Sequence, residues 1–104
     1  MIERLVDKAA KELEISPVKI REINLIDKSQ IPYKTALGHT YDSGDFKKNL
    51  KDAVNVSLFN EFNKRRKVSL KKGYLRGIGI STYIEACGGG GPEFAKVSIG
   101  KNGN

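Results

Sequence analysis

The segment YLRGIGISTYI, residues 74–84, has apolar residues with a period of two, whereas the chain before it follows helical spacing. Ile78, Ile80 and Ile84 fall on one face of an extended chain, and Tyr83 falls on the other. Such alternation is typical of a β-strand with one buried face. The segment therefore predicts a strand that follows a helical region.

A second run of alternating residues follows a break. Four glycines and Pro92 interrupt the first run, and alternation resumes from Glu93 to Ile99. Two such runs around a Gly-Pro break favour two antiparallel strands. Asn102-Gly103 is typical of a two-residue hairpin turn, which needs a further strand. Because two strands alone are marginal in water, we expect a segment of a longer protein, with a small natural domain as the alternative.

The beginning of the chain predicts a pair of helices. Apolar residues recur with helical spacing from Ile2 to Leu13, which indicates an amphipathic helix. Ser16-Pro17 fits an N-cap followed by proline in the first turn of a second helix, which we expect to end near Ile23. Residues 24–40 lack sustained periodicity and predict a long loop.

A third helix is predicted from the segment YDSGD, residues 41–45, where Asp42 or Ser43 can cap it and Asp45 lies in its first turn. It should continue along the apolar row Leu50, Val54, Leu58 and Phe62 and end before Gly73. The predicted fold is thus α+β, with two or three helices before a small antiparallel sheet. We expect one unit with the following parts: a helix pair (1–24), a loop (25–42), a helix with a basic stretch (43–72), and strands with a glycine-rich loop (73–104).

Length and composition exclude several classes of protein. The 104 residues suffice for one small domain with a modest core. No apolar run approaches the roughly 20 residues that cross a bilayer, and the first residues lack the order of a signal peptide, so we expect a soluble cytoplasmic protein. The lone Cys87 and the single His39 exclude an internal disulfide and the usual Cys/His zinc sites.

The net charge of +7 lies entirely after residue 42, because residues 1–42 contain seven basic and seven acidic residues. Much of it falls between Lys64 and Arg76, a stretch with seven basic residues and no acid. One interpretation is a small binding module for nucleic acid or an acidic partner. The other is a solvated helix end, where cations are favoured by the helix dipole. No aromatic residue is interleaved among the basic residues from Lys64 to Lys72 for base stacking, so we do not expect nucleic acid as a partner.

The glycine run at residues 88–91 is the most unusual chemical feature. Glycine backbone N–H groups can approach a ligand closely, which suits a cofactor or small substrate. The run is neither a P-loop nor a dinucleotide fingerprint, so a flexible connection between strands remains open. Cys87 as a nucleophile and Glu85 with Glu93 as an acid and base are less favoured than ordinary loop residues. We assign no catalytic residue and no metal ligand.

Three stretches together carry a family pattern: RGIGISTYIEACGGGGPE (76–93), ERLVD (3–7) with SPVKIREINLI (16–26), and IPY (31–33) with YDSGDF (41–46). In this order they closely resemble the large, molybdenum-binding subunit of the aerobic carbon monoxide dehydrogenase, aldehyde oxidase and xanthine dehydrogenase family. The resemblance covers nearly the whole chain. The four glycines before Pro-Glu look most like the carbon monoxide dehydrogenase branch.

The resemblance implies an oxidoreductase whose complete large subunit holds molybdenum in molybdopterin cytosine dinucleotide, with iron–sulfur and flavin subunits as partners. The family's glycine-glutamine-glycine segment, catalytic glutamate and active-site loop have no counterpart in these residues. We therefore expect the chain by itself to be inactive and to hold no cofactor, with the remainder of the large subunit as its first partner. By alignment, the residues that line the substrate side of the molybdenum centre would be Glu85, Ala86, Cys87, Gly88, Gly89, Gly90 and Gly91.

Overall fold

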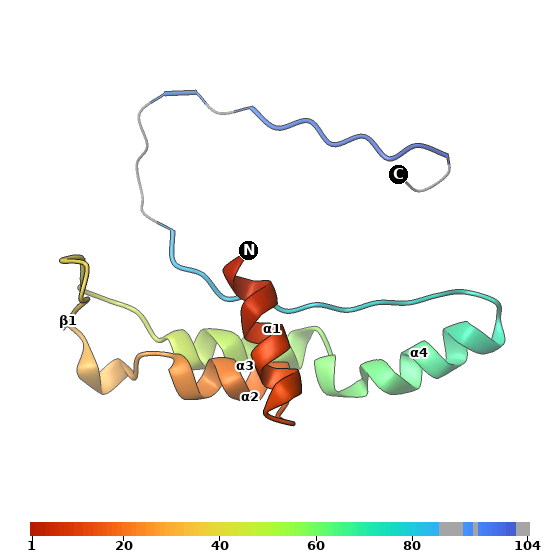
Figure 1. Ribbon diagram of the computed structural model, residues 1–104, viewed down its shortest axis with the longest axis horizontal. Coiled ribbons are helices and arrows are strands. Elements are labelled where there is room, and N and C mark those ends of the chain that lie inside the picture. Colours follow the sequence, from red (N-terminus) through yellow and green to blue (C-terminus); the bar gives the residue numbers. More distant parts are fainter. Residues whose placement is uncertain (86–90, 93, 102–104) are drawn as a thin grey trace.

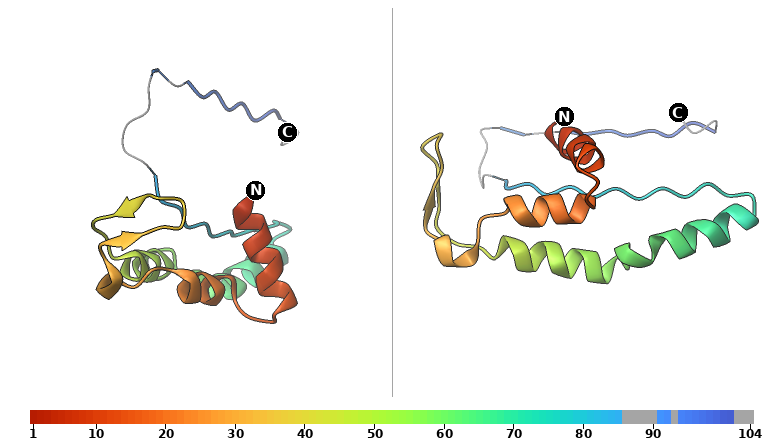
Figure 2. Two further views of the ribbon diagram at one scale, coloured as in Figure 1. Left: turned by 60° about the vertical axis from the view of Figure 1, so that its left-hand side comes forward. Right: turned by 60° about the horizontal axis from the view of Figure 1, so that its bottom comes forward.

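The computed structural model describes residues 1–85, 91–92 and 94–101. Within these residues, the fold consists of four α-helices, two short 3-10 helices and a two-stranded antiparallel sheet (Figure 1), which confirms the α+β class. Figure 2 shows α1 crossing over the layer formed by the other helices. In chain order the elements are α1 (Ile2–Glu12), α2 (Pro17–Asn24), η1 (Lys28–Gln30), β1 (Tyr33–Lys34), β2 (Thr40–Tyr41), α3 (Phe46–Val56), η2 (Phe59–Glu61) and α4 (Phe62–Lys71).

The helix pair forms as its sequence predicts. Ser16 caps α2, because its hydroxyl oxygen accepts a hydrogen bond from the backbone N–H of Lys19 at 3.0 Å, and Pro17 occupies the first turn. Proline is tolerated there because a first-turn N–H has no partner within the helix. The apolar faces of α1 and α2 meet, and they bury Ala10 and Ile20. This confirms the predicted helix pair.

The predicted third helix is wrong in two respects. Its N-cap is Asp45, whose carboxylate accepts from the N–H of Lys48 at 3.1 Å, and not Asp42 or Ser43. The helix is also divided in two, because Leu58 has a φ of +50° and cannot continue a right-handed helix. The guanidinium of Arg65 donates to the carbonyls of Leu58 and Ser57 at the break and so ties α4 to the end of α3.

The segment predicted as a loop, residues 24–40, instead contains η1 and most of a small hairpin. Asp27 caps η1, and a reciprocal contact with Gln30 forms a capping box. In the hairpin, Tyr33 pairs with Tyr41 in an antiparallel register. Its turn uses Gly38, which has a φ of +87°, a conformation that glycine adopts without steric cost. Apolar periodicity does not reveal these short elements, because capping residues and a turn glycine specify them instead.

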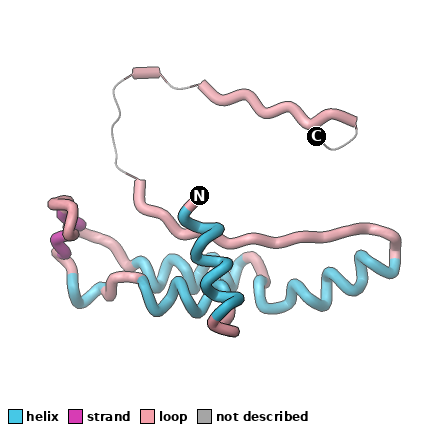
Figure 3. Tube along the Cα trace, viewed as in Figure 1, coloured by secondary structure: helices cyan, strands magenta, loops and turns pink. Residues whose placement is uncertain are grey.

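The strands predicted over residues 74–84 and 93–99 are also wrong for the part of the chain that the structure describes. Residues 74–85 and 94–101 contain no strand (Figure 3), and the sheet is instead the hairpin of β1 and β2. Alternation supplies a suitable face, but a strand also needs a neighbouring backbone to pair with. Glu93 and the predicted Asn102-Gly103 turn lie outside the described residues.

The core is small and the molecule is open. Of the described apolar residues, only Ala10, Ile20, Leu50 and Val54 are buried. The radius of gyration is 17.6 Å, whereas a compact domain of this length has about 13 Å. Among the described residues, no helix is both long and apolar enough to cross a membrane. The helices therefore form an open scaffold, along which residues 74–85 extend.

Candidate functional site

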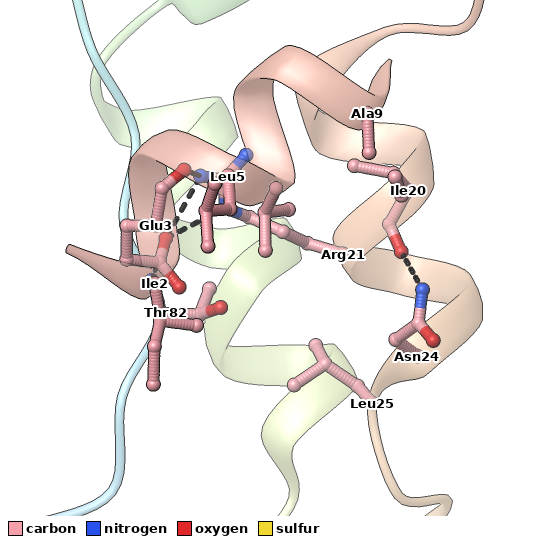
Figure 4. A pocket seen from close by; sticks show the side chains of 10 residues that line it. Ile2, Glu3, Leu5, Ala9, Ile20, Arg21, Asn24, Leu25 and Thr82 are labelled. Carbon is pink, nitrogen blue, oxygen red and sulfur yellow. Dashed lines mark hydrogen bonds and ion pairs between the residues drawn. The ribbon is translucent and has the colours of Figure 1, made fainter. Parts of the chain in front are cut away.

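A buried polar site lies where residues 80–85 pass the helix pair (Figure 4). At its centre is Arg21 of α2, whose side chain is only 2% exposed. Its Nε and Nη2 donate to Oε2 of Glu3 at 2.9 and 2.8 Å, and its Nη1 donates to the carbonyl of Pro17 at 2.8 Å and lies 2.9 Å from Oδ1 of Asp7. Arg21 therefore joins the beginning of α1 to the beginning of α2.

Arg21 remains charged in this site. Burial disfavours the charged guanidinium, but the hydrogen bonds and charges of Glu3 and Asp7 outweigh burial and raise the pKa of Arg21 above its ordinary value. A buried cation is tolerated only when it is paired and hydrogen-bonded. The geometry meets this condition, because no buried side-chain nitrogen or oxygen among the described residues lacks a partner.

Glu3 also holds the extended segment. The backbone N–H of Thr82 donates to Oε2 of Glu3 at 3.0 Å, across 79 positions of sequence. Beside this contact lies a largely apolar pocket of about 440 Å³. Apolar side chains of α1 and α2, with Leu25 and Thr82, form its walls. The carboxylate of Glu3 is thus the point at which residues 80–85 join the helical scaffold.

On the other side of residues 80–85 lies a larger open groove of about 800 Å³. Helix α3 forms one wall through Phe46, Asn49 and Leu50, and residues 80–85 form the other. Glu85 and Asp45 also line this groove, which gives it acidic groups near its apolar wall. Residues 80–85 therefore separate two hollows, one against α1 and one against α3.

The structure describes only two of the predicted site residues. Glu85 is exposed and lines the groove beside α3. Gly91 has a φ of +115°, a region that residues with a side chain rarely adopt, and an added Cβ would meet no atom within 4 Å. The other predicted site residues, Ala86, Cys87, Gly88, Gly89 and Gly90, lie outside the described residues.

Sequence reasoning missed Glu3, Arg21 and Thr82. A signal for the first two was present, because Glu3 and Asp7 are four residues apart on α1 and share a helix face. Two carboxylates on one helix face can both pair with a single guanidinium. Nothing in the local sequence indicated that Thr82 would join them, since its contact depends on the path of the distant chain.

The described residues do not supply a metal site. Within residues 1–85, 91–92 and 94–101, no three His, Cys, Asp or Glu side chains gather closely enough to hold a metal ion. These residues therefore do not fit a set of metal ligands, and we derive no chemical step through a metal. Their contribution is the placement of backbone and polar groups.

Several residues of the basic stretch have structural contacts. Arg65 donates to the carbonyls of Leu58 and Ser57 at 2.9 and 3.0 Å. Arg76 donates from Nε to the hydroxyl of Ser69 at 2.9 Å, which fixes the chain after α4. These contacts favour the interpretation of Lys64 to Arg76 as a solvated helix end with structural arginines.

Comparison with known proteins extends these observations, although no family model matches the sequence. The carbon monoxide dehydrogenase large chain of Hydrogenophaga pseudoflava is 39% identical over 100 residues, which are 93% of this chain and 12% of that protein. The carbon monoxide dehydrogenase large chain of Afipia carboxidovorans is 34% identical over 95 residues, or 86% of this chain and 12% of that protein. The nicotine 6-hydroxylase large subunit of Paenarthrobacter nicotinovorans is 28% identical over 86 residues, or 83% of this chain and 10% of that subunit.

A solved structure agrees with these relatives. Reconstituted CO dehydrogenase from Oligotropha carboxidovorans matches with a TM-score of 0.58 and 31% identity, covering 69% of this chain and 9% of that chain. The chain spans about an eighth of the length of the two carbon monoxide dehydrogenase large chains. Sequence and fold together place this chain in the family of the carbon monoxide dehydrogenase large chain, where it matches one segment of the large subunit.

Proposed function

We propose that this chain acts as a segment of the molybdenum-binding large subunit of a carbon monoxide dehydrogenase-like oxidoreductase. Its helices form the scaffold, and residues 85–91 contribute shape and backbone hydrogen bonds to the substrate side of the metal centre. The observation that carries the proposal is the 39% identity over 93% of the chain to a carbon monoxide dehydrogenase large chain.

The proposal extends to the cofactor and to the partners. The cofactor of the complete subunit is molybdopterin cytosine dinucleotide, which supplies the redox chemistry through its molybdenum. The remainder of the large subunit surrounds this segment, and iron–sulfur and flavin subunits accept the electrons. Exposed apolar side chains support a covering partner, because Leu75 and Phe94 are both 93% exposed and isolated domains seldom leave so many large apolar residues in water.

A segment exchange tests this function. The stretch of the Hydrogenophaga pseudoflava large chain that aligns with this chain is replaced by the present sequence, and the chimera is produced with its partner subunits. We expect about one molybdenum per large subunit and reduction of a dye by carbon monoxide. A chimera that assembles with its partners but holds no molybdenum would contradict the proposal.

Two glycines provide a matched pair of variants in this chimera. Gly91 and Gly77 both have open space where a Cβ would lie, but only Gly91 has a φ in the positive region. Gly91→Ala should strain the backbone by about 1–3 kcal/mol and lower the rate of dye reduction, whereas Gly77→Ala should leave it unchanged. Equal effects would show that the backbone at Gly91 has no special role in the reaction.

A further inference from the structure

We propose that Glu3 is a positioning residue for the stretch Ile80–Glu85, and that Arg21 holds the Glu3 carboxylate in place for this purpose. The importance of this placement for catalysis rests on the proposed function, in which the residues after Glu85 lie beside the metal centre. The contact itself, however, belongs to the present structure and can be tested without any cofactor.

The first argument is that Glu3 cannot easily change its conformation. Each of the five N–H bonds of Arg21 has an acceptor nearby. Nε donates to Oε2 of Glu3, and Nη1 lies against the carbonyl of Pro17 and Oδ1 of Asp7. Nη2 donates to Oε2 of Glu3 and also reaches the backbone carbonyl of Glu3 at 3.4 Å. Two of these N–H groups converge on Oε2 of Glu3. A planar guanidinium fixed at this many points fixes the carboxylate oxygen as well.

The second argument is that this oxygen is where the extended segment is attached. Among the described residues, the Thr82 N–H to Glu3 contact is the hydrogen bond that links residues 80–85 to the helices. The preceding link along the chain is the contact from Arg76 to Ser69. A donor to a charged acceptor forms a stronger hydrogen bond than a neutral pair, so this single contact has a large effect on placement.

The length of free chain shows how much the contact matters. With Thr82 attached, Glu85 lies three residues from a fixed point, which an extended chain spans in about 10 Å. Without it, the nearest fixed point is Arg76, nine residues away, and the possible reach of Glu85 grows to about 31 Å. Loss of the hydrogen bond from Thr82 to Glu3 would thus triple the distance over which Glu85 can move.

Asp7 offers a matched control on the same helix. Its carboxylate pairs with Arg21 as that of Glu3 does, at 2.9 Å, but the Thr82 N–H donates to Glu3. Glu3→Gln and Asp7→Asn therefore both remove one negative charge next to Arg21. Only Glu3→Gln alters the acceptor of Thr82.

The experiment measures amide hydrogen exchange at Thr82 and ¹⁵N order parameters at Tyr83 and Ile84 in the purified chain. Glu3→Gln should speed exchange at Thr82 by about tenfold and lower the order parameters, because a neutral acceptor replaces a charged one. Asp7→Asn keeps an oxygen acceptor beside Arg21 and leaves Glu3 intact, so it should change both quantities much less. Unchanged exchange in Glu3→Gln with helix content retained, or equal acceleration in Asp7→Asn, would overturn the proposal.

A second pair of variants keeps the test decisive if Glu3→Gln fails to fold. Thr82→Pro removes the donor and leaves Glu3 and Arg21 intact, whereas Ser81→Pro removes an N–H that has no partner among the described contacts. Only Thr82→Pro should lower the order parameters of Tyr83 and Ile84. If both variants leave them unchanged, the proposal fails.

The segment-exchange chimera separates the two proposals. An inactive chimera would contradict the proposed function and leave the exchange measurements valid. In an active chimera, Glu3→Gln should lower kcat/KM by about tenfold at unchanged molybdenum content, and Asp7→Asn should lower it much less. An active chimera with equal kinetics in both variants would show that Glu3 does not position the segment for the reaction.

Discussion

Replacement of Arg21 by methionine should destabilise the helix pair strongly. Methionine keeps much of the apolar stem that Arg21 packs between α1 and α2 but removes every donor. Breaking a fully buried ion pair costs about 3–5 kcal/mol. Here the remaining carboxylates can regain water, because the side chains of Glu3 and Asp7 are 31% and 46% exposed. We therefore expect a loss of about 2–3 kcal/mol.

Urea unfolding followed by circular dichroism at 222 nm measures this loss. Short helices are marginal in water without tertiary contacts, so their ellipticity reports the packing of α1 on α2. If the free energy of unfolding falls by about 1 kcal/mol per molar urea, the midpoint of unfolding should fall by about 2 M or more. A double-mutant cycle with Glu3→Gln gives the share that belongs to the Glu3 contact.

Arg4 is the matched control, since it lies on α1, is exposed and has no side-chain contact among those described. Arg4→Met should change the free energy of unfolding by less than about 0.5 kcal/mol. If Arg21→Met behaves like Arg4→Met, then the site does not hold the helices together, and the argument from its geometry is refuted.

Three further predictions concern the rest of the scaffold. The hydrogen bond from Lys47, with those from Ser29, holds the pKa of Asp27 well below its usual range. The contribution of the Asp27 carboxylate to stability is therefore present above about pH 4 and is lost as the pH falls through the depressed pKa. A ¹³C titration of the carboxyl group should show this depressed pKa, and Lys47→Met should return it toward the ordinary value. Leu50→Ala should lower the free energy of unfolding by about 2 kcal/mol or more in urea unfolding, because Leu50 is buried, whereas Val56→Ala, at an exposed position of α3, should change it little. Ser16→Ala should cost about 1 kcal/mol and shorten α2, as judged by ¹³C secondary shifts, and normal shifts at Lys19 would contradict the capping role.

Patterns within short stretches of sequence correctly predicted the helices that are stabilised by contacts between sequence neighbours. The apolar spacing of α1 and the Ser16-Pro17 cap lie within a few residues of the backbone that they organise, and both were identified correctly. The family was also indicated by motifs, and the relatives bear it out. These features depend on neighbours in sequence, which is why periodicity and motif order suffice to find them.

The errors in predicting the third helix arose where contacts that the sequence pattern does not show changed where the helix begins and ends. The apolar row of α3 predicted a continuous helix, but Leu58 adopts a positive φ and Arg65 donates to the carbonyls of Ser57 and Leu58 at the break. Asp45 is the cap in place of Asp42, because its carboxylate reaches the N–H of Lys48. Two suitable caps three residues apart cannot be ranked by propensity alone.

The candidate site shows more clearly which contacts short-range sequence patterns cannot predict. Glu85 and Gly91 were chosen through the family resemblance, and whether they line a metal centre remains a prediction. The carboxylate of Glu3 and the N–H of Thr82 were not chosen at all, although they meet at 3.0 Å. Their meeting depends on the path of the chain between α4 and residue 82, which no short-range pattern specifies.

The amino-acid sequence by itself determined the helix pair and the family, because these follow from side-chain spacing, capping and motif order within short stretches. Only the tertiary structure decided the break at Leu58, the placement of the sheet at residues 33–41 and the attachment of Thr82 to Glu3. The physical reason is that a strand, a helix end and a buried ion pair each need a partner for their polar groups. Which partner is available depends on the arrangement of the whole chain.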